Sequence, residues 1–210
     1  MTRDSHVVFI KDTAAGQLVE ANLYDGISEE NLRAYKEEWQ PLLRAARQFY
    51  IDLRKRGHNP PPVVEDAHWD WEHKVFLKQG SLSYRHFALE CNEKTEGMMQ
   101  LELSMHRSRL EPGRHLVYVS YISVAPWSRK ALTATPRYRG VGSILLAQAI
   151  GTSLEEGFHG RIGLHSLPGA ADWYRGYKMT SFGKDPNYEN LESFEMSANA
   201  ATEFMQRLNK

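Results

Sequence analysis

The sequence is poor in cysteine, with Cys91 as the single one among 210 residues. One cysteine excludes an intramolecular disulfide and any metal site built from several cysteines. Long apolar runs are also missing, because no stretch reaches the roughly 18 apolar residues of a membrane span. Residues 1–10 lack the apolar core of a signal peptide. These absences favour a reducing compartment, so we expect a cytoplasmic protein that does not engage a membrane.

An excess of charge is absent too, since 26 basic residues balance 26 acidic ones. The molecule as a whole therefore has no field that would gather a polyanion or an anionic membrane surface. Nucleic acid is accordingly not an expected partner. Four basic residues nevertheless fall close together in the sequence and could form a local patch: Arg129, Lys130, Arg137 and Arg139.

The composition, with 41% hydrophobic and 25% charged residues, is that of an ordinary globular protein. The length suits one domain with a substantial core. We expect a single domain over 1–210. Its helical part, with a possible first strand, covers 1–80, the sheet covers 81–196, and a terminal helix covers 197–210.

Apolar residues between Ser28 and Arg56 recur at the three-and-four spacing of an amphipathic helix. Ser28 suits the N-cap and Gly57 the end of this segment. Pro41 removes a backbone donor and disfavours helix for the residue before it. The pattern therefore predicts two helices or one kinked helix.

Further along, the pattern alternates between strands and helices. A short helix around 69–78 precedes three strands joined by turns, which suggests an antiparallel meander. The expected strands are 87–91, 98–105, 116–124, 161–165 and 193–196, and the expected helices are 142–156, 170–177 and the C-terminal segment. This order predicts a mixed α+β fold with helices packed on a sheet.

A glycine-containing loop between a strand and a helix carries the clearest chemical signal. The strand is Tyr118–Pro126, and the loop and helix start are Pro136–Leu146. Free amides at a helix N-terminus bind phosphate, and glycine lets the backbone approach it closely. The loop lacks the Gly-Lys-Ser/Thr ending of a loop that binds nucleoside triphosphates, and it lacks the third glycine of a dinucleotide-binding fingerprint. On the loop alone, a purely structural turn is an equally good interpretation.

The pattern Arg137-x-x-Gly140-x-Gly142, after a strand ending Ile122–Pro126, resembles the coenzyme A pyrophosphate motif of the GNAT superfamily of N-acyltransferases. Residues Gly160–His165 resemble the next strand of that fold, and Ala170–Tyr174 resembles its following helix. The resemblance covers roughly 115–196. It implies a central, mostly antiparallel, splayed sheet with helices on both faces.

The resemblance also implies an activity, the transfer of an acetyl or other acyl group from acyl-CoA to an unidentified primary amine without a metal. Tyr174 would be the acid that protonates the departing thiolate, although Trp173 and Tyr174 could also be simple core aromatics. Acetyl-CoA or another acyl-CoA would be the co-substrate. Its expected binding residues are Ile122, Ser123, Val124, Arg137, Tyr138, Arg139, Gly140, Val141, Gly142 and Ser143.

The general base is not identified by the resemblance. Tyr118 stands where some relatives carry glutamate, and Ser120 is no base by itself. A water chain or one of three residues on the preceding strands could substitute, although each of the three is more simply a solvated residue of the sheet: Glu90, Glu102 and His106.

Two further departures concern the loop and the later helix. The segment between Pro126 and Arg137 is longer than in typical relatives, so it forms part of a substrate site or a disordered excursion. Lys178 replaces a usual glycine, and His165 and Ser166 stand where an asparagine is often found.

Other interpretations remain open. The fold could serve as a non-catalytic module that binds coenzyme A or a protein, or as a toxin-like enzyme that acetylates charged transfer RNA, for which the neutral charge gives no support. A homodimer is also allowed. A metal site is not expected, because the spacing of His68, Asp70, Glu72 and His73 matches no standard one.

Overall fold

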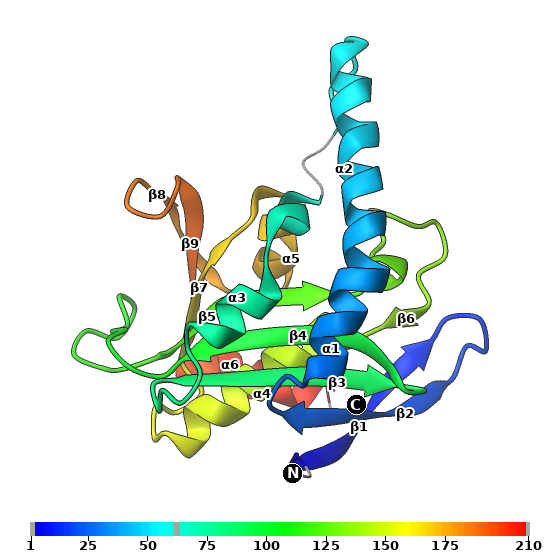
Figure 1. Ribbon diagram of the computed structural model, residues 1–210. Coiled ribbons are helices and arrows are strands. Elements are labelled where there is room, and N and C mark those ends of the chain that lie inside the picture. Colours follow the sequence, from blue (N-terminus) through cyan, green and yellow to red (C-terminus); the bar gives the residue numbers. More distant parts are fainter. Residues whose placement is uncertain (1–2, 61–63, 209–210) are drawn as a thin grey trace. The chain divides into compact units, whose positions relative to one another are not determined.

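The architecture comes from a computed structural model in which residues 3–60 and 64–208 are described (Figure 1). Its strands are β1 (Ser5–Asp12), β2 (Leu18–Asp25), β3 (Tyr84–Cys91), β4 (Lys94–Glu102), β5 (Val117–Val124), β6 (Tyr138–Arg139), β7 (Ile162–Ser166), β8 (Thr180–Asp185) and β9 (Leu191–Met196). Within the described ranges they form one sheet in the order β6-β1-β2-β3-β4-β5-β7-β9-β8.

Among the described residues, three helices lie between β2 and β3, and three more lie among and after the later strands, in the order that the sequence pattern predicts. They are α1 (Glu29–Ala34), α2 (Gln40–Lys55), α3 (Trp71–Phe76), α4 (Val141–Glu155), α5 (Ala171–Gly176) and α6 (Ala198–Leu208). A π-helical turn η1 (Tyr35–Trp39) joins α1 to α2, and three 3-10 turns are η2 (Glu65–His68), η3 (Pro126–Ser128) and η4 (Pro168–Ala170). The terminal helix lies where the sequence predicts it, and residues 209–210 of that prediction lie outside the described residues.

The sheet is mostly antiparallel, which confirms the predicted fold class. Antiparallel pairs include β1–β2, β2–β3, β7–β9 and β8–β9, whereas β5 and β7 run parallel. The predicted strands after residue 80 lie within a few residues of the observed ones. Three elements are additional: the second strand of the β1–β2 hairpin, the short strand β6, and the edge strand β8.

Two compact units emerge from the contacts within the chain. Unit 1 comprises Met1–Gly80, His86–Met98 and Ser123–Gly142, and unit 2 comprises Ser81–Arg85, Met99–Ile122 and Ser143–Lys210. The single-domain organisation expected from the sequence stays a prediction.

The first helices of unit 1 follow the predicted stripe. Ser28 forms a capping box with Asn31, which satisfies amides at the start of α1. The predicted break at Pro41 takes the form of the π-helical turn η1, with Pro41 in the first turn of α2, where a missing amide costs little. Tyr35 and Trp39 of η1 are fully buried and anchor the helices to the core of unit 1.

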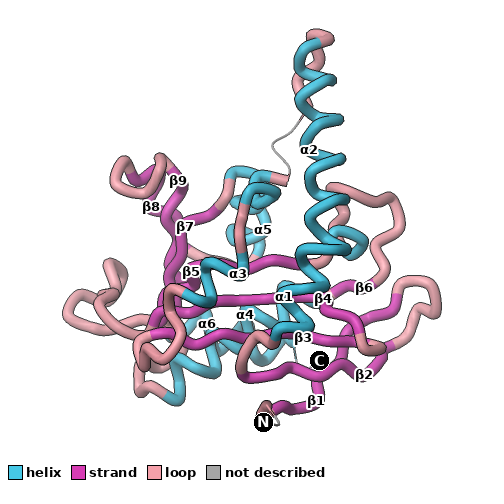
Figure 2. Tube along the Cα trace, viewed as in Figure 1, coloured by secondary structure: helices cyan, strands magenta, loops and turns pink. Residues whose placement is uncertain are grey.

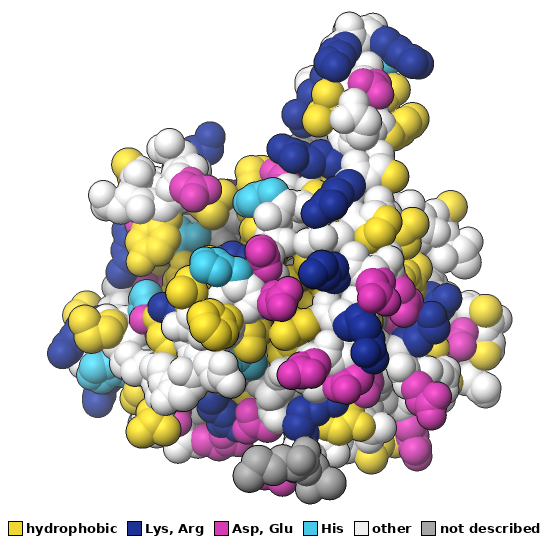
Figure 3. All heavy atoms as spheres, viewed as in Figure 1, with side chains coloured by type: hydrophobic (Ala, Val, Ile, Leu, Met, Phe, Trp, Pro, Cys, Tyr) yellow, Lys and Arg dark blue, Asp and Glu magenta, His cyan; other side chains and the backbone are white. Residues whose placement is uncertain are grey.

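The rest of α2 leaves the body of unit 1 (Figure 1). Leu43 is its single buried residue, and Leu42 and Phe49 are at least half exposed. Lys and Arg side chains line the projecting part (Figure 3). No helix in 3–60 or 64–208 is long and apolar enough to span a membrane.

The core of unit 2 is built on β7 and β9, which lie side by side in Figure 2. Ile162, Leu164, Phe194 and Met196 are buried on these strands. Helix α6 adds Ala201 and Phe204 to the buried set. The turn before β7 brings Gly160 so close to α6 that an added Cβ would stand 2.9 Å from the Ala201 Cβ. Unit 2 therefore holds β7 firmly from one side, and its other neighbour is β5.

Candidate functional site

The parallel pair of β5 and β7 opens partway along its length. Cα partners run from Val117↔Ile162 to Val119↔Leu164 and then end. Both strands continue, because β5 reaches Ile122 within unit 2 and β7 reaches Ser166. Beyond Leu164, β7 stays paired with β9 (Figure 2). Beyond the end of the ladder, the backbone donors and acceptors of β5 are not paired with β7, which is the arrangement that the addition of an extended ligand as a strand would use.

Two aromatic side chains lie beside this opening. The Tyr118 hydroxyl of β5 is 2.8 Å from Nδ1 of His165 on β7. His165 Nε2 lies 3.3 Å from Oδ2 of Asp185, at the end of β8. Tyr118 pairs with Gly163 in the ladder, so His165, two residues further on, points to the same face. The three side chains form one chain of polar contacts.

Stacked rings hold the side chains of Tyr118 and His165 in place. The His106 ring lies parallel to Tyr118 with centroids 4.2 Å apart, and the Tyr188 ring lies parallel to His165 at 3.9 Å. Burial lowers the pKa of His165, and the hydrogen bond and charge of Asp185 offset part of that shift. Burial also raises the pKa of Tyr118 above its usual value. Near neutral pH the pair is therefore an uncharged phenol beside an uncharged imidazole.

The glycine loop has the backbone that a phosphate site needs. Gly140 has φ 96°, a left-handed value that disfavours other residues, and no atom lies within 4 Å of the place a Cβ would take. Helix α4 begins at the next residue, Val141. The open space at Gly140 and the first amides of α4, which have no acceptor within the helix, make the kind of helix start at which anions bind.

The predicted side chains around the loop fall into two groups. Arg139 is exposed on β6, and Arg137 is half exposed, with its guanidinium 5.2 Å from the Trp127 ring centroid. Tyr138 is instead buried and accepts a hydrogen bond from Asn92, so its side chain is structural. In unit 2 the Ser143 hydroxyl lies 2.8 Å from that of Tyr177.

The start of the long segment before the loop is anchored to a buried carboxylate. Glu96 of β4 is fully buried and accepts hydrogen bonds from the Trp127 indole at 2.8 and 2.9 Å and from the Ser128 hydroxyl. Burial raises the pKa of Glu96 to about 7, against the opposing effect of these donors and of Arg137, 3.8 Å away. The backbone amide of Arg137 also donates to the Trp127 carbonyl. The segment therefore fixes the entrance to the loop.

A second buried carboxylate anchors the same segment. Arg129 donates to both oxygens of Asp66, at 2.8 and 2.7 Å, and to the Val124 carbonyl at 2.6 Å. The Ser123 side chain faces inward, donating to Asp66 at 3.3 Å and accepting from Trp71 at 3.4 Å. Any ligand contact at Ser123 is thus through its backbone, and the Val124 carbonyl keeps one lone pair for a ligand.

Tyr174 of α5 is buried in unit 2 between Trp173 and Phe194. Burial raises the pKa of its hydroxyl, which keeps the proton on the oxygen. The position agrees with a core aromatic and with a proton donor alike.

The three substitutes considered for the base have other partners. Glu90 pairs with Arg3 at 2.8 Å and accepts from Asn31, so it is part of the structure of unit 1. Glu102 lies 3.2 Å from His106. Glu102 and His106 belong to unit 2, where the His106 ring stacks on that of Tyr118. Over 3–60 and 64–208, no three His, Cys, Asp or Glu residues are placed to hold a metal.

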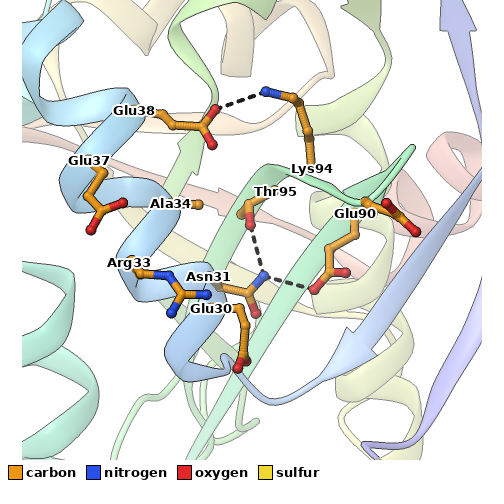
Figure 4. A pocket seen from close by; sticks show the side chains of 10 residues that line it. Glu30, Asn31, Arg33, Ala34, Glu37, Glu38, Glu90, Lys94 and Thr95 are labelled. Carbon is orange, nitrogen blue, oxygen red and sulfur yellow. Dashed lines mark hydrogen bonds and ion pairs between the residues drawn. The ribbon is translucent and has the colours of Figure 1, made fainter.

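A separate hollow in unit 1 lies against α1, η1 and the β3–β4 turn (Figure 4). Asn31 donates to Glu90 at 2.8 Å and to Thr95 at 2.9 Å, and Lys94 lies 3.1 Å from Glu38. Its central polar groups thus bond to one another, which favours a structural role.

Sequence reasoning missed the contact of Tyr118 with His165 and the parts played by Asp185 and Tyr188. His165 stood out in the sequence merely as a departure from a family pattern. Asp185, the last residue of β8, and Tyr188 after it had no signal in the sequence, because the strand itself was not predicted and its position depends on the pairing of β8 with β9.

Comparison with known proteins places the fold. No protein-family model and no curated protein sequence matches the chain. Solved structures do. An acetyltransferase assigned to the GNAT family from Desulfovibrio desulfuricans matches with a TM-score of 0.52 at 10% identity, over 85% of this chain and 99% of that one.

Two further structures are similar to the same degree. The paia N-acetyltransferase of Thermoplasma acidophilum, solved with coenzyme A, has a TM-score of 0.50 at 12% identity, over 85% of this chain and 99% of that one. An N-acyl amino acid synthase from uncultured soil microbes has a TM-score of 0.52 at 12% identity, over 87% of this chain and 94% of that one. The chain therefore has the fold of the GNAT acetyltransferases, as its motifs predicted.

Proposed function

We propose that this chain, which has the fold of the GNAT acetyltransferases, transfers an acyl group from acyl-CoA to a primary amine. The observation that carries the proposal is the ladder between β5 and β7, which ends at Val119↔Leu164 although both strands continue. The paia N-acetyltransferase of similar fold was solved with coenzyme A. Acetyl is the first acyl group to test, and acceptor identity lies beyond what the fold determines.

Two parts of the chain bind the co-substrate in this proposal. The amides that follow Gly140 hold the pyrophosphate, and Arg137 and Arg139 add positive charge beside them. The backbone of Ile122 and Val124 pairs with the extended arm of the co-substrate as an added strand would. Ser123 and Tyr138 contribute backbone alone, because their side chains are turned into unit 1.

The reaction is direct attack of the amine on the thioester that acyl-CoA supplies. A backbone N–H on β5 stabilises the negative charge that develops on the carbonyl oxygen. Tyr174, whose raised pKa keeps it protonated, donates its proton to the departing thiolate. No covalent bond to the protein forms, so no nucleophilic side chain is needed.

The remaining assignments follow from the same proposal. We place the enzyme in the cytoplasm, where acyl-CoA is present and its single cysteine, Cys91, stays reduced. An acyl-CoA and an amine are its partners, and a second copy of the chain is an additional one.

Thiol release tests the function. The purified protein is incubated with acetyl-CoA and, separately, with longer acyl-CoA esters, each with a panel of primary amines. The proposal predicts release of free thiol that depends on the amine, together with an acylated amine identified by mass. Thiol release that no amine increases, with any of the esters, would contradict it.

A further inference from the structure

The acyl transfer described above requires that an ammonium lose a proton before its nitrogen can attack. The polar chain of Tyr118, His165 and Asp185 lies beside the opening of β5 and β7, where an acceptor would meet the thioester. Its members come from three different strands and contact one another at 2.8 and 3.3 Å. Such a chain on three strands is held by the whole sheet of unit 2, so its geometry is preorganised.

The contacts determine which way the protons lie. Asp185 can accept a hydrogen bond but, when ionised, cannot donate one, so His165 carries its proton on Nε2. An imidazole protonated on Nε2 has a lone pair on Nδ1. The Tyr118 hydroxyl is then the donor to Nδ1, and its oxygen keeps two lone pairs for another donor. The row of contacts from Tyr118 through His165 to Asp185 thus has a hydrogen-bond acceptor at its Tyr118 end and a negative charge at its Asp185 end.

The surroundings favour transfer in that direction. The charge on Asp185 is secured because the Asn187 amide, together with His165, holds the pKa of its carboxyl below the usual value. Burial keeps His165 neutral at rest, and Asp185 stabilises the imidazolium once formed. The titratable or charged groups that face His165 from neighbouring elements are Tyr118 on β5, His106 and Arg109 after β4, Asp185 on β8 and Tyr188 after it, with Glu102 behind His106.

We propose that Tyr118, His165 and Asp185 form a proton relay that removes the proton from the acceptor amine. The relay rests on the acyltransferase function proposed above and identifies the general base of that reaction. Tyr118 touches the amine, His165 receives the proton, and Asp185 is a positioning residue. The acceptor is therefore a primary ammonium that reaches the face of β5 on which Tyr118 lies.

Each bond in the step has a partner. An N–H bond of the ammonium breaks and an O–H bond forms at Tyr118, while the original Tyr118 O–H bond breaks and an N–H bond forms at His165 Nδ1. The positive charge moves from the amine to the imidazolium, beside the Asp185 carboxylate. The electron pair left on the nitrogen forms a bond to the thioester carbon, and the C–S bond breaks with its electron pair on the sulfur, which Tyr174 protonates. The attached nitrogen loses its second proton to solvent, and solvent returns a proton to Tyr174. Solvent later removes the proton from His165 and restores the neutral imidazole.

The arrangement also explains the stacked rings. A relay through an imidazole needs the ring to keep its orientation while the charge changes. Tyr188 covers His165 face to face at 3.9 Å, and its ring face also favours a cation. His106 covers Tyr118 at 4.2 Å and is paired with Glu102 at 3.2 Å. These rings restrict rotation at both hydrogen-bonding positions.

The test combines kinetics with a reading of the imidazole that needs no acyl donor. Amine-dependent thiol release from acetyl-CoA is measured with benzylamine, spermidine and a lysine-containing peptide, across the pH range in which histidine titrates. The full-length protein and the variants His165→Gln, Tyr118→Phe and Asp185→Asn are compared. His115→Gln is the matched control, because His115 also stacks on a ring, that of Phe158, which is not a member of the relay. Nitrogen NMR of labelled histidines reports the tautomer of His165.

The relay predicts that His165→Gln and Tyr118→Phe each lower kcat/KM by about 100-fold, the lower range for general base catalysis. The KM for acetyl-CoA stays unchanged. Asp185→Asn keeps more activity but moves the acid limb of the pH profile to lower pH, because the imidazolium loses its carboxylate. His115→Gln behaves as the unsubstituted protein. The NMR signal of His165 is that of the Nε2–H tautomer.

The outcomes separate the two proposals. Thiol release that survives His165→Gln with an unchanged pH profile would overturn the relay and leave the function intact. An Nδ1–H tautomer would do the same. If the unsubstituted protein releases no thiol with any amine, the function fails and the relay with it. If His165→Gln lowers the unfolding midpoint, its lost activity could reflect unfolding, and the milder Asp185→Asn becomes the test. A shift of its acid limb to lower pH supports the relay, and an unshifted pH profile overturns it.

Discussion

Arg129 donates hydrogen bonds from both terminal nitrogens to the buried carboxylate of Asp66, at 2.8 and 2.7 Å. This bidentate pair joins the long segment before the glycine loop to the turn η2, sixty-three residues earlier in the chain. Burial would raise the pKa of Asp66, but Arg129 outweighs it and the pKa lies below its usual value. The pair thus keeps Asp66 ionised and holds the segment in unit 1.

Replacing Arg129 by Met should destabilise the protein by about 3–5 kcal/mol, because a buried carboxylate then lacks its cation. Equilibrium urea unfolding measures the change. Arg129→Lys should recover little of the loss, since an ammonium cannot form the bidentate pair. The double variant Asp66→Asn, Arg129→Met removes both charges and should be more stable than Arg129→Met alone. Equal stability of Arg129→Met and the unsubstituted protein would contradict this account.

Tyr174→Phe isolates a hydroxyl from its ring. The ring packs against Trp173 and Phe194 in unit 2, and Phe preserves these contacts. If Tyr174 protonates the thiolate, turnover should fall by about 100-fold, while the affinity for acetyl-CoA measured by calorimetry stays the same. Tyr50→Phe is the control, because that hydroxyl bonds the Ala131 carbonyl in unit 1. Unchanged turnover would leave Tyr174 as a core aromatic.

Glu96 should make stability depend on pH. Its pKa in the folded protein is about 7, against an ordinary value of 4.5. The folded state therefore holds the proton more tightly, so stability is highest below pH 4.5 and falls as pH rises towards about 7. The fall attributable to this group is about 3 kcal/mol, at about 1.4 kcal/mol for each pKa unit.

Glu96→Gln removes that titration and keeps an acceptor for the Trp127 indole. The variant should gain stability relative to the unsubstituted protein as pH rises through this window, as chemical unfolding at several pH values would show. Glu37→Gln, at an exposed carboxylate of η1, serves as the control. Parallel stability curves for Glu96→Gln and the unsubstituted protein would refute the shift.

Two glycines of unit 2 separate backbone strain from crowding. Gly157 and Gly160 both have left-handed φ values, 72° and 82°. Alanine at Gly157 meets no atom within 4 Å, so it should cost about 1–2 kcal/mol from the backbone alone. Alanine at Gly160 would also collide with Ala201 of α6, adding about 1–3 kcal/mol. Thermal and urea unfolding should rank Gly160→Ala clearly below Gly157→Ala, and the reverse order would be inconsistent with the packing described.

The sequence predicts this fold well where local signals agree. The strand β5, the loop at Gly140 and the helix α4 form one continuous stretch, and the resemblance to the GNAT fold rested on this stretch together with Gly160–His165 and Ala170–Tyr174. The break at Pro41 was predicted, but its form, a π-helical turn, depends on the burial of Tyr35 and Trp39, which is a tertiary effect.

The candidate site was predicted unevenly for the same reason. The glycine loop is local in sequence, whereas the contacts Glu96–Trp127, Arg129–Asp66 and Tyr118–His165 join residues 31 to 63 positions apart. No periodicity reports such pairs. Two alternatives were open for the segment after Pro126, and its contacts with two buried carboxylates, which the sequence presented as ordinary charged residues, favour an ordered segment.

The central claim is that the chain binds an acyl-CoA through the loop at Gly140, and a calorimetric titration with acetyl-CoA tests it most directly. Gly140→Ala and Gly80→Ala are titrated alongside, because both glycines have left-handed φ values and open space around them. The account predicts saturable binding to the unsubstituted protein and to Gly80→Ala, weakened about tenfold or more in Gly140→Ala, a loss of about 1.4 kcal/mol. Absence of binding to the unsubstituted protein, or equal binding to all three, would contradict the account.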